Sequence, residues 1–165
     1  MVKKICGLMV CLCVSVIAFA QSQPKQVLAK ADIDNFVKNF TAIQELLDAH
    51  VDDLTSVTEG MDTFEADDMQ ATFAKIRSFA VPPDLKKGLS GLGMGDNGFE
   101  KIMVILYSVG IVMSDQMLQE MGVEEQEGAA IIKEQMQSMR DCIHVADMSL
   151  IASRSEELMS ILENM

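Results

Sequence analysis

The chain has 165 residues, a formal net charge of −12 at pH 7, 49% hydrophobic residues, 14 methionines and no tryptophan. Its length fits one domain with a real hydrophobic core. Its negative charge repels phosphate backbones and anionic headgroups, so nucleic acid is not expected as a partner.

Residues 1–20 have the pattern of a secretory signal peptide. Lys3 and Lys4 precede an apolar run over residues 5–20 that closes on a small-x-small triplet. A retained anchor is the competing interpretation, but no basic stop-transfer cluster follows, so cleavage before Gln21 is favoured. We therefore expect a periplasmic or secreted protein with no stable membrane span after cleavage.

Cleavage would leave Cys142 as the single cysteine of the mature chain. Stability then has to come from packing, because no intramolecular disulfide can form. A buried thiol is the default for Cys142, and pairing between chains is the alternative. The predicted organisation is a signal peptide over 1–20, an N-terminal extension over 21–31 and a helical bundle domain over 32–165.

Hydrophobic periodicity predicts helices along the whole mature chain, and no window shows a sustained strand alternation. Asp32 and Asp147 are expected to cap the first and the last helix. The apolar residues that follow recur at steps of three and four, which places each set on one helical face. These sets are Ile33, Phe36, Phe40, Ile43 and Leu47, and Met148, Ile151, Leu158, Leu162 and Met165. An internal duplication is the less favoured explanation of their similarity.

Three more helices are predicted between these two. The first covers about residues 65–80 and is stopped by Pro82 and Pro83, because proline cannot continue the hydrogen-bond ladder. The second covers residues 98–121 and the third about residues 125–144. Gly122 can take the left-handed cap in the turn between them.

The helix over 98–121 is apolar on nearly every side of its middle, IMVILYSVGIVM, which indicates a helix surrounded by other helices or by lipid. A bilayer span needs about twenty such residues. The polar residues at both ends are expected to leave too short a run; they are Glu100, Lys101, Asp115 and Gln116. Ser108 and Gly110 are expected where a crossing helix comes close. The sequence therefore predicts an all-α, single-domain bundle of about five helices, with residues 99–121 at its centre.

Gly93, Gly95 and Gly98 follow the order G-x-G-x-x-G of dinucleotide-binding loops. That fingerprint needs a buried strand before the first glycine, whereas the preceding PPDLKKGLSGL breaks any strand. A capping loop is favoured, and no cofactor is expected. Leu92 and Met94 either attach this loop to the core or, if exposed, form a mobile lid or partner contact.

Met113, Met117 and Met121 recur every fourth residue, so they share a helical face. Thioethers are ligands for Cu(I), and Cys142 on the next helix could complete such a site. The favoured alternative is that these methionines fill the core or line a groove for apolar partners, because methionine adapts to varied shapes.

Catalytic and metal-binding patterns are not recognisable. The chain contains no E-x-x-H, H-E-x-x-H, G-x-S-x-G or P-loop motif. His50 and the neighbouring carboxylates are interpreted as helix-end residues. We therefore expect no enzyme and no metal site.

The leading hypothesis is an exported, non-enzymatic helical protein that binds another envelope protein or an apolar ligand. The candidate surface is Leu92, Met94, Met117 and Met121. The alternative is a Cu(I)-binding protein that uses Met113, Met117, Met121 and Cys142.

Overall fold

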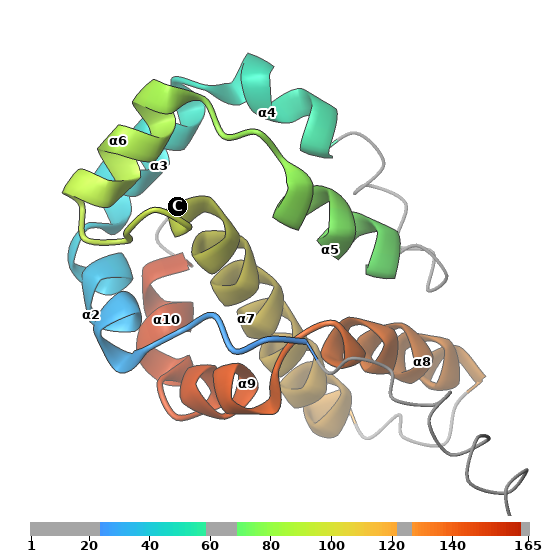
Figure 1. The fold of residues 1–165 in the computed structure, drawn as a ribbon. Coiled ribbons are helices and arrows are strands. Elements are labelled where there is room, and N and C mark those ends of the chain that lie inside the picture. The colour runs from blue at the N-terminus through green and yellow to red at the C-terminus, as the bar shows by residue number, and fades with distance from the viewer. Residues whose placement is uncertain (1–23, 59–68, 122–126, 163–165) are drawn as a thin grey trace, which may run out of the picture.

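The computed structural model describes residues 24–58, 69–121 and 127–162, and every regular element within these ranges is an α-helix (Figure 1). The described helices are α2 (Lys30–Lys38), α3 (Phe40–Asp48), α4 (Val51–Thr58), α5 (Met69–Ser78), α6 (Pro83–Gly91), α7 (Gly98–Met121), α8 (Glu127–Asp141), α9 (Val145–Ala152) and α10 (Ser155–Leu162). The all-α prediction is confirmed for these residues. The predicted signal peptide lies outside them.

The described residues form nine helices where the sequence led us to expect about five. The predicted first helix is divided between α2 and α3 at Asn39, whose Nδ2 donates to the carbonyl of Leu92 at 3.1 Å. The last is divided between α9 and α10 around Ser153. The segment PPDLKKGLSGL, for which no helix was predicted, contains helix α6, with Pro83 in its first turn. Proline suits that position because the first turn needs no N–H donor.

α7 lies at the centre of the molecule, with α2, α9 and α10 on one side and α5 and α8 on the other (Figure 1). Ile102, Ile105 and Ile111 are fully buried along it. This confirms the predicted central helix.

By length and composition, Gly98–Glu120 is also apolar enough to cross a membrane, with a mean hydropathy of 1.4 over its best window. The expectation that its terminal charges leave too short a run is therefore wrong. A core helix that is mostly buried meets the same criterion, whereas 39% of this window is buried among the described helices.

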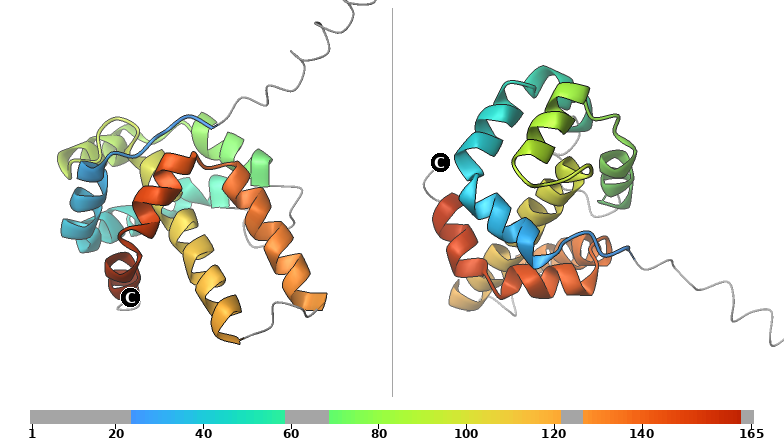
Figure 2. Two further views of the ribbon diagram at one scale, coloured as in Figure 1. Left: turned by 90° about the horizontal axis from the view of Figure 1, so that it is seen from below. Right: turned by 60° about the vertical axis from the view of Figure 1, so that its left-hand side comes forward.

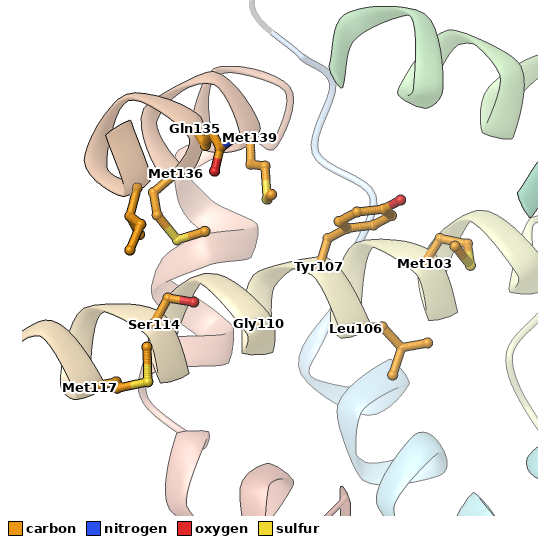
Figure 3. A pocket seen from close by; sticks show the side chains of 10 residues that line it. Met103, Leu106, Tyr107, Gly110, Ser114, Met117, Gln135, Met136 and Met139 are labelled. Carbon is orange, nitrogen blue, oxygen red and sulfur yellow. The ribbon is translucent and has the colours of Figure 1, made fainter. Parts of the chain in front are cut away.

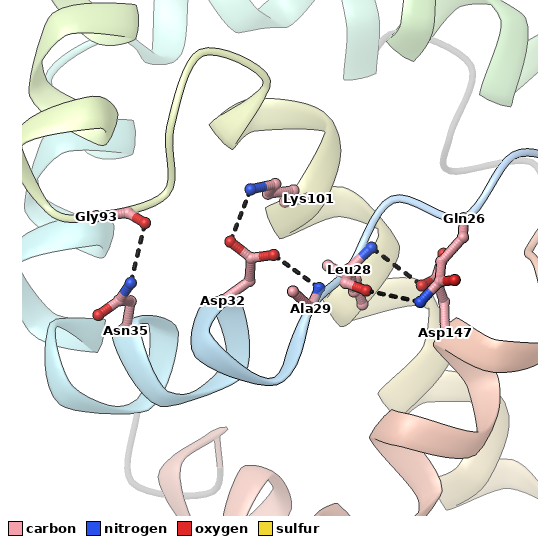
Figure 4. A network of polar contacts seen from close by, with 8 residues as sticks. All are labelled: Gln26, Leu28, Ala29, Asp32, Asn35, Gly93, Lys101 and Asp147. Carbon is pink, nitrogen blue, oxygen red and sulfur yellow. Dashed lines mark hydrogen bonds and ion pairs between the residues drawn. The ribbon is translucent and has the colours of Figure 1, made fainter.

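Residues 24–29 precede α2 and contact α9. The backbone amides of Val27 and Leu28 donate to the two carboxylate oxygens of Asp147 at 2.8 and 3.0 Å (Figure 4). The buried carboxylate of Asp147 therefore holds residues 27–28 against α9, and it does not cap that helix as predicted. His144 caps α9, since its Nδ1 accepts from the amide of Ala146 at 3.1 Å.

Asp32 joins the same end of the molecule to α7. It lies in the first turn of α2 rather than before it, and it accepts from the Ala29 amide at 2.8 Å. Lys101 in α7 donates to its other oxygen at 2.6 Å (Figure 4). Both side chains of this ion pair are largely buried. The first turns of α2 and α7 are therefore joined by a shielded charge pair.

The glycine motif forms the turn between α6 and α7. Gly93 and Gly95 have φ angles of 83° and 75°, in the region that favours glycine. The carbonyl of Gly93 accepts from Asn35 Nδ2 at 2.9 Å (Figure 4). A Cβ on Gly98 would come within 2.9 Å of Met94 Cβ. A helix precedes this turn where a dinucleotide-binding loop has a strand, which agrees with a capping loop.

Candidate binding groove

The C-terminal half of α7 and α8 lie side by side and extend away from the other helices (Figure 2). Between them is a hollow of about 550 Å³, which we call the α7–α8 groove. From α7 it is lined by Met103, Leu106, Tyr107, Gly110, Ser114 and Met117, and from α8 by Ile132, Gln135, Met136 and Met139 (Figure 3).

Helical spacing explains why these residues share one groove. The α7 residues recur at steps of three and four between Met103 and Met117, which keeps them on one face of the helix. That stretch is about 21 Å long at about 1.5 Å per residue. The α8 residues between Ile132 and Met139 follow the same rule. Met136 and Met139 extend from α8 toward α7 (Figure 3).

The walls of the groove are mainly apolar and adaptable. Met136 and Met139 are buried, whereas Met117 is 48% exposed at the open edge. Thioether side chains are flexible and polarisable, so a methionine-lined wall can follow different apolar shapes. The groove therefore combines a fixed apolar floor with an adjustable edge.

The polar groups of the groove are uncharged side chains of Tyr107, Ser114 and Gln135. The Tyr107 ring packs against Phe73 of α5 with 5.1 Å between centroids. Burial raises the pKa of Tyr107, which keeps its phenol neutral at physiological pH. These groups can orient a ligand by hydrogen bonding, but none supplies a charged acid or base at that pH.

Gly110 opens the floor of the groove. A Cβ added there would meet nothing within 4 Å, so no crossing helix is close to it. Ser108 is fully buried on the other side of α7, and its hydroxyl has no hydrogen-bond partner among the described residues. Among the residues that the structure describes, the expected close crossing is therefore not found at Gly110, where α7 is open.

Two polar contacts hold α8 in place at one end of the groove. Arg140 of α8 pairs with Asp115 of α7. Arg77 of α5 donates to the carbonyl of Cys142 at 2.9 Å, just after α8 ends. These contacts anchor the C-terminal end of α8 to the bundle.

The predicted partner surface is only partly brought together. Met117 lines the groove, and Met121 is the last residue of α7, with a side chain outside the described part. Met94 is fully buried and Leu92 is half-buried in the α6–α7 turn. Met94 is therefore a core residue and not a surface contact, because the two left-handed glycines turn it inward.

The copper ligand set is not assembled as the sequence suggested. Met113 is 40% exposed but does not line the groove that Met117 lines. Cys142 is a free, buried thiol whose Sγ donates to the Ser138 carbonyl at 3.4 Å. Burial raises its pKa, while the charges of Arg77 and Asp141 act in opposite directions.

Histidine and carboxylate side chains do not cluster in the part of the chain that the structure describes. No group of three or more His, Cys, Asp or Glu there is arranged to hold a metal ion. His50 instead pairs locally with Asp53 at 3.1 Å.

A second hollow of about 500 Å³ lies where α2 and α3 meet α10. Its lining includes Lys38, Thr41, Gln44 and Ser160, so it is more polar than the α7–α8 groove.

Comparisons with protein-family models, with curated proteins and with solved structures find no match for this chain.

Proposed function

We propose that this chain is an exported, non-enzymatic helical protein that binds an apolar ligand, or an apolar segment of another envelope protein, in the α7–α8 groove. The observation that carries the proposal is the opening of about 550 Å³ between two helices, with four methionines on its walls. Pockets of this size that are mainly apolar and hold a few neutral polar groups are typical binding sites.

The methionine content has a structural explanation in this proposal. Met103, Met117, Met136 and Met139 all line the groove although they come from two helices. Methionine in a closed core fills gaps, whereas methionine at an opening accepts different apolar partners. The partly exposed Met117 favours the second role.

Export is the second part of the proposal. It rests on the leader pattern of residues 1–20, with Lys3 and Lys4 before an apolar run. The mass of the protein recovered from the periplasm or the medium tests it. A chain that begins at Gln21 is the expected result, and a full-length chain retained in the membrane fraction would contradict export by cleavage.

Binding is tested with the exported protein and the neutral apolar dye Nile red. We expect a blue-shifted emission and saturable binding. Met117→Gln should weaken the dye affinity several-fold, because it places an amide at the edge of the groove. Met113→Gln is the matched control, since Met113 is similarly exposed on the same helix but outside the groove. Absence of saturable binding, or an equal effect of both substitutions, would contradict the proposal.

Cu(I) binding is a second candidate function, with a set of ligands that differs from the one predicted from the sequence. Cu(I) accepts thioether ligands, and Met117 of α7 and Met136 of α8 line the same groove, whereas Met103 lies about four turns from Met117 and cannot share an ion with it. The buried and hydrogen-bonded Cys142 does not join that set. An anaerobic Cu(I) titration against a chelator of moderate affinity tests this alternative. Unchanged chelator absorbance would remove it, and so would a Met117→Leu variant that binds equally well.

A further inference from the structure

Methionine side chains differ widely in exposure over the part of the chain that the structure describes. Met117 and Met113 are 48% and 40% exposed, and both lie in the second half of α7. The other described methionine side chains are half-buried or buried; they are Met69, Met94, Met103, Met136, Met139, Met148 and Met159. A dissolved oxidant therefore reaches the thioethers of Met117 and Met113 first, because it has to collide with the sulfur.

These two exposed methionines have different surroundings. Met117 lines the α7–α8 groove, where it extends from α7 beyond Ser114 (Figure 3). Met113 does not line the groove. Met136 and Met139 line it from α8, but they are 7% and 5% exposed. The groove thus has an accessible thioether at its edge and shielded thioethers on its α8 wall.

Hydrogen peroxide converts a methionine thioether to a sulfoxide. The sulfur lone pair attacks a peroxide oxygen, so that an S–O bond forms and the O–O bond breaks. The sulfur is oxidised by loss of an electron pair, and the hydroxide that leaves takes up the remaining peroxide proton and departs as water. The product carries a strong hydrogen-bond acceptor where the thioether was apolar.

A sulfoxide at Met117 would make the edge of the groove polar. Its oxygen accepts hydrogen bonds from water, and an apolar ligand that covers Met117 has to remove this water, which costs binding free energy. The fold does not depend on this side chain, because it is already half exposed near the end of α7. Oxidation of Met117 should therefore weaken binding without unfolding the protein.

From these observations we propose that Met117 is a site of oxidation by peroxides, and that its sulfoxide lowers the affinity of the α7–α8 groove for apolar ligands. The inference rests on the proposed function, because it assigns a means of regulation to the same groove. Met113 is oxidised as readily, but its sulfoxide leaves binding unchanged because that side chain lies outside the groove. A bound ligand in turn shields Met117 and slows its oxidation.

The first test follows oxidation at each methionine of the exported protein in dilute hydrogen peroxide, by tandem mass spectrometry of its peptides. Sulfoxide should form at Met117 and Met113 several-fold faster than at Met136 and Met139. Saturating Nile red should slow the reaction at Met117 several-fold and leave the rate at Met113 unchanged. Met113 is thus an internal control for any direct reaction between the dye and the peroxide.

Leucine variants then separate the effect of Met117 from that of the other methionines. Leucine has a similar volume and no sulfur, so Met117→Leu and Met113→Leu should both bind Nile red before treatment. After treatment that oxidises the exposed methionines alone, the parent and Met113→Leu should lose affinity several-fold, whereas Met117→Leu keeps it. The thermal midpoints should stay close to those before treatment, because the core methionines remain reduced.

Several outcomes would overturn the inference without touching the proposed function. These are oxidation of Met136 as fast as that of Met117, equal slowing of Met113 and Met117 by the dye, and an equal loss of affinity in Met117→Leu and the parent. Unchanged affinity of the parent with Met117 fully oxidised would overturn it as well. In each case the untreated protein still binds Nile red, whereas absence of saturable binding before treatment would remove the proposed function itself.

Discussion

The two halves of α7 have different surroundings, although both are rich in apolar residues. The first half carries Ile102 and Ile105, which are completely covered by neighbouring helices, and its first turn is joined to α2 by the Lys101–Asp32 pair. The second half leaves Gly110 and Met117 open beside α8. Both halves contribute residues to the groove, but Gly110 and Met117, where the helix is open, lie in the second half. One continuous helix is therefore packed among other helices at one end and borders an open groove at the other.

The largest difference between the halves is expected for truncation of apolar side chains. Ile105→Ala should lower the free energy of unfolding by about 3–4 kcal/mol, because it leaves a cavity among packed helices. Met117→Ala should cost less than about 1 kcal/mol, because that side chain is half in water already. Urea denaturation of both variants measures this. Similar losses for the two would mean that the groove is closed in solution.

Ion pairs provide the second comparison. Lys101→Met should destabilise the protein by about 2–4 kcal/mol, because it leaves the buried Asp32 carboxylate without its cation. Arg140→Met removes the Asp115 partner in the open half, where both side chains are about one third exposed, and should cost less than about 1 kcal/mol. Thermal denaturation at two salt concentrations checks both. An equal loss would show that the Arg140–Asp115 contact is shielded as well.

Replacing a glycine by alanine should change the stability of the protein in opposite directions in the two halves of α7. Gly98→Ala should destabilise by about 1–3 kcal/mol, since its Cβ would meet the Cβ atoms of Met94 and Leu89 at 2.9 and 3.0 Å. Gly110→Ala should stabilise by up to about 1 kcal/mol, because alanine favours the helix and meets nothing within 4 Å. Denaturant midpoints of the two variants decide the signs. Destabilisation by Gly110→Ala would place another element over the groove.

The extent of α7 could be predicted from the sequence because its apolar run is long and its capping turn is distinct. The predicted helix over 98–121 and Gly98–Met121 coincide. The break at Asn39 could not be predicted from the continuous apolar stripe across it. It depends on a hydrogen bond to Leu92, more than fifty positions away in the chain. The helix expected to stop before Pro82 and Pro83 does end there, at Ser78, but the start of α6 at Pro83 was not predicted, because proline after a helix end and proline at a helix start look alike in sequence.

The groove itself was only partly predictable. Periodicity showed that Met113 and Met117 share a face, but it could not show that only Met117 lines an opening. The contributions of Met103 and Tyr107 were missed, because a helix that is apolar all round gives no signal for which side stays uncovered. The sequence left open whether Met94 packs in the core or is exposed as a partner contact, because its burial depends on the left-handed turns at Gly93 and Gly95.

The smallest expected effect concerns the alkaline range and the border between the two halves, where Tyr107 lies. Burial raises the pKa of Tyr107 above its ordinary value of 10.0 and the pKa of Cys142 above its ordinary value of 9.0. The unfolded chain therefore loses these protons first as pH rises. The stability that the neutral groups provide is complete below about pH 9 and is lost as the pH passes their folded-state pKa values. Tyr107→Phe combined with Cys142→Ala should flatten the fall of the thermal midpoint above that pH, relative to its value at pH 7.

If water filled the groove as freely as bulk solvent, Tyr107→Phe alone would leave the alkaline profile unchanged, and the phenol would titrate near 10.0 by ultraviolet absorbance. A delayed phenol titration would instead show that the floor of the groove is dry enough to receive an apolar partner.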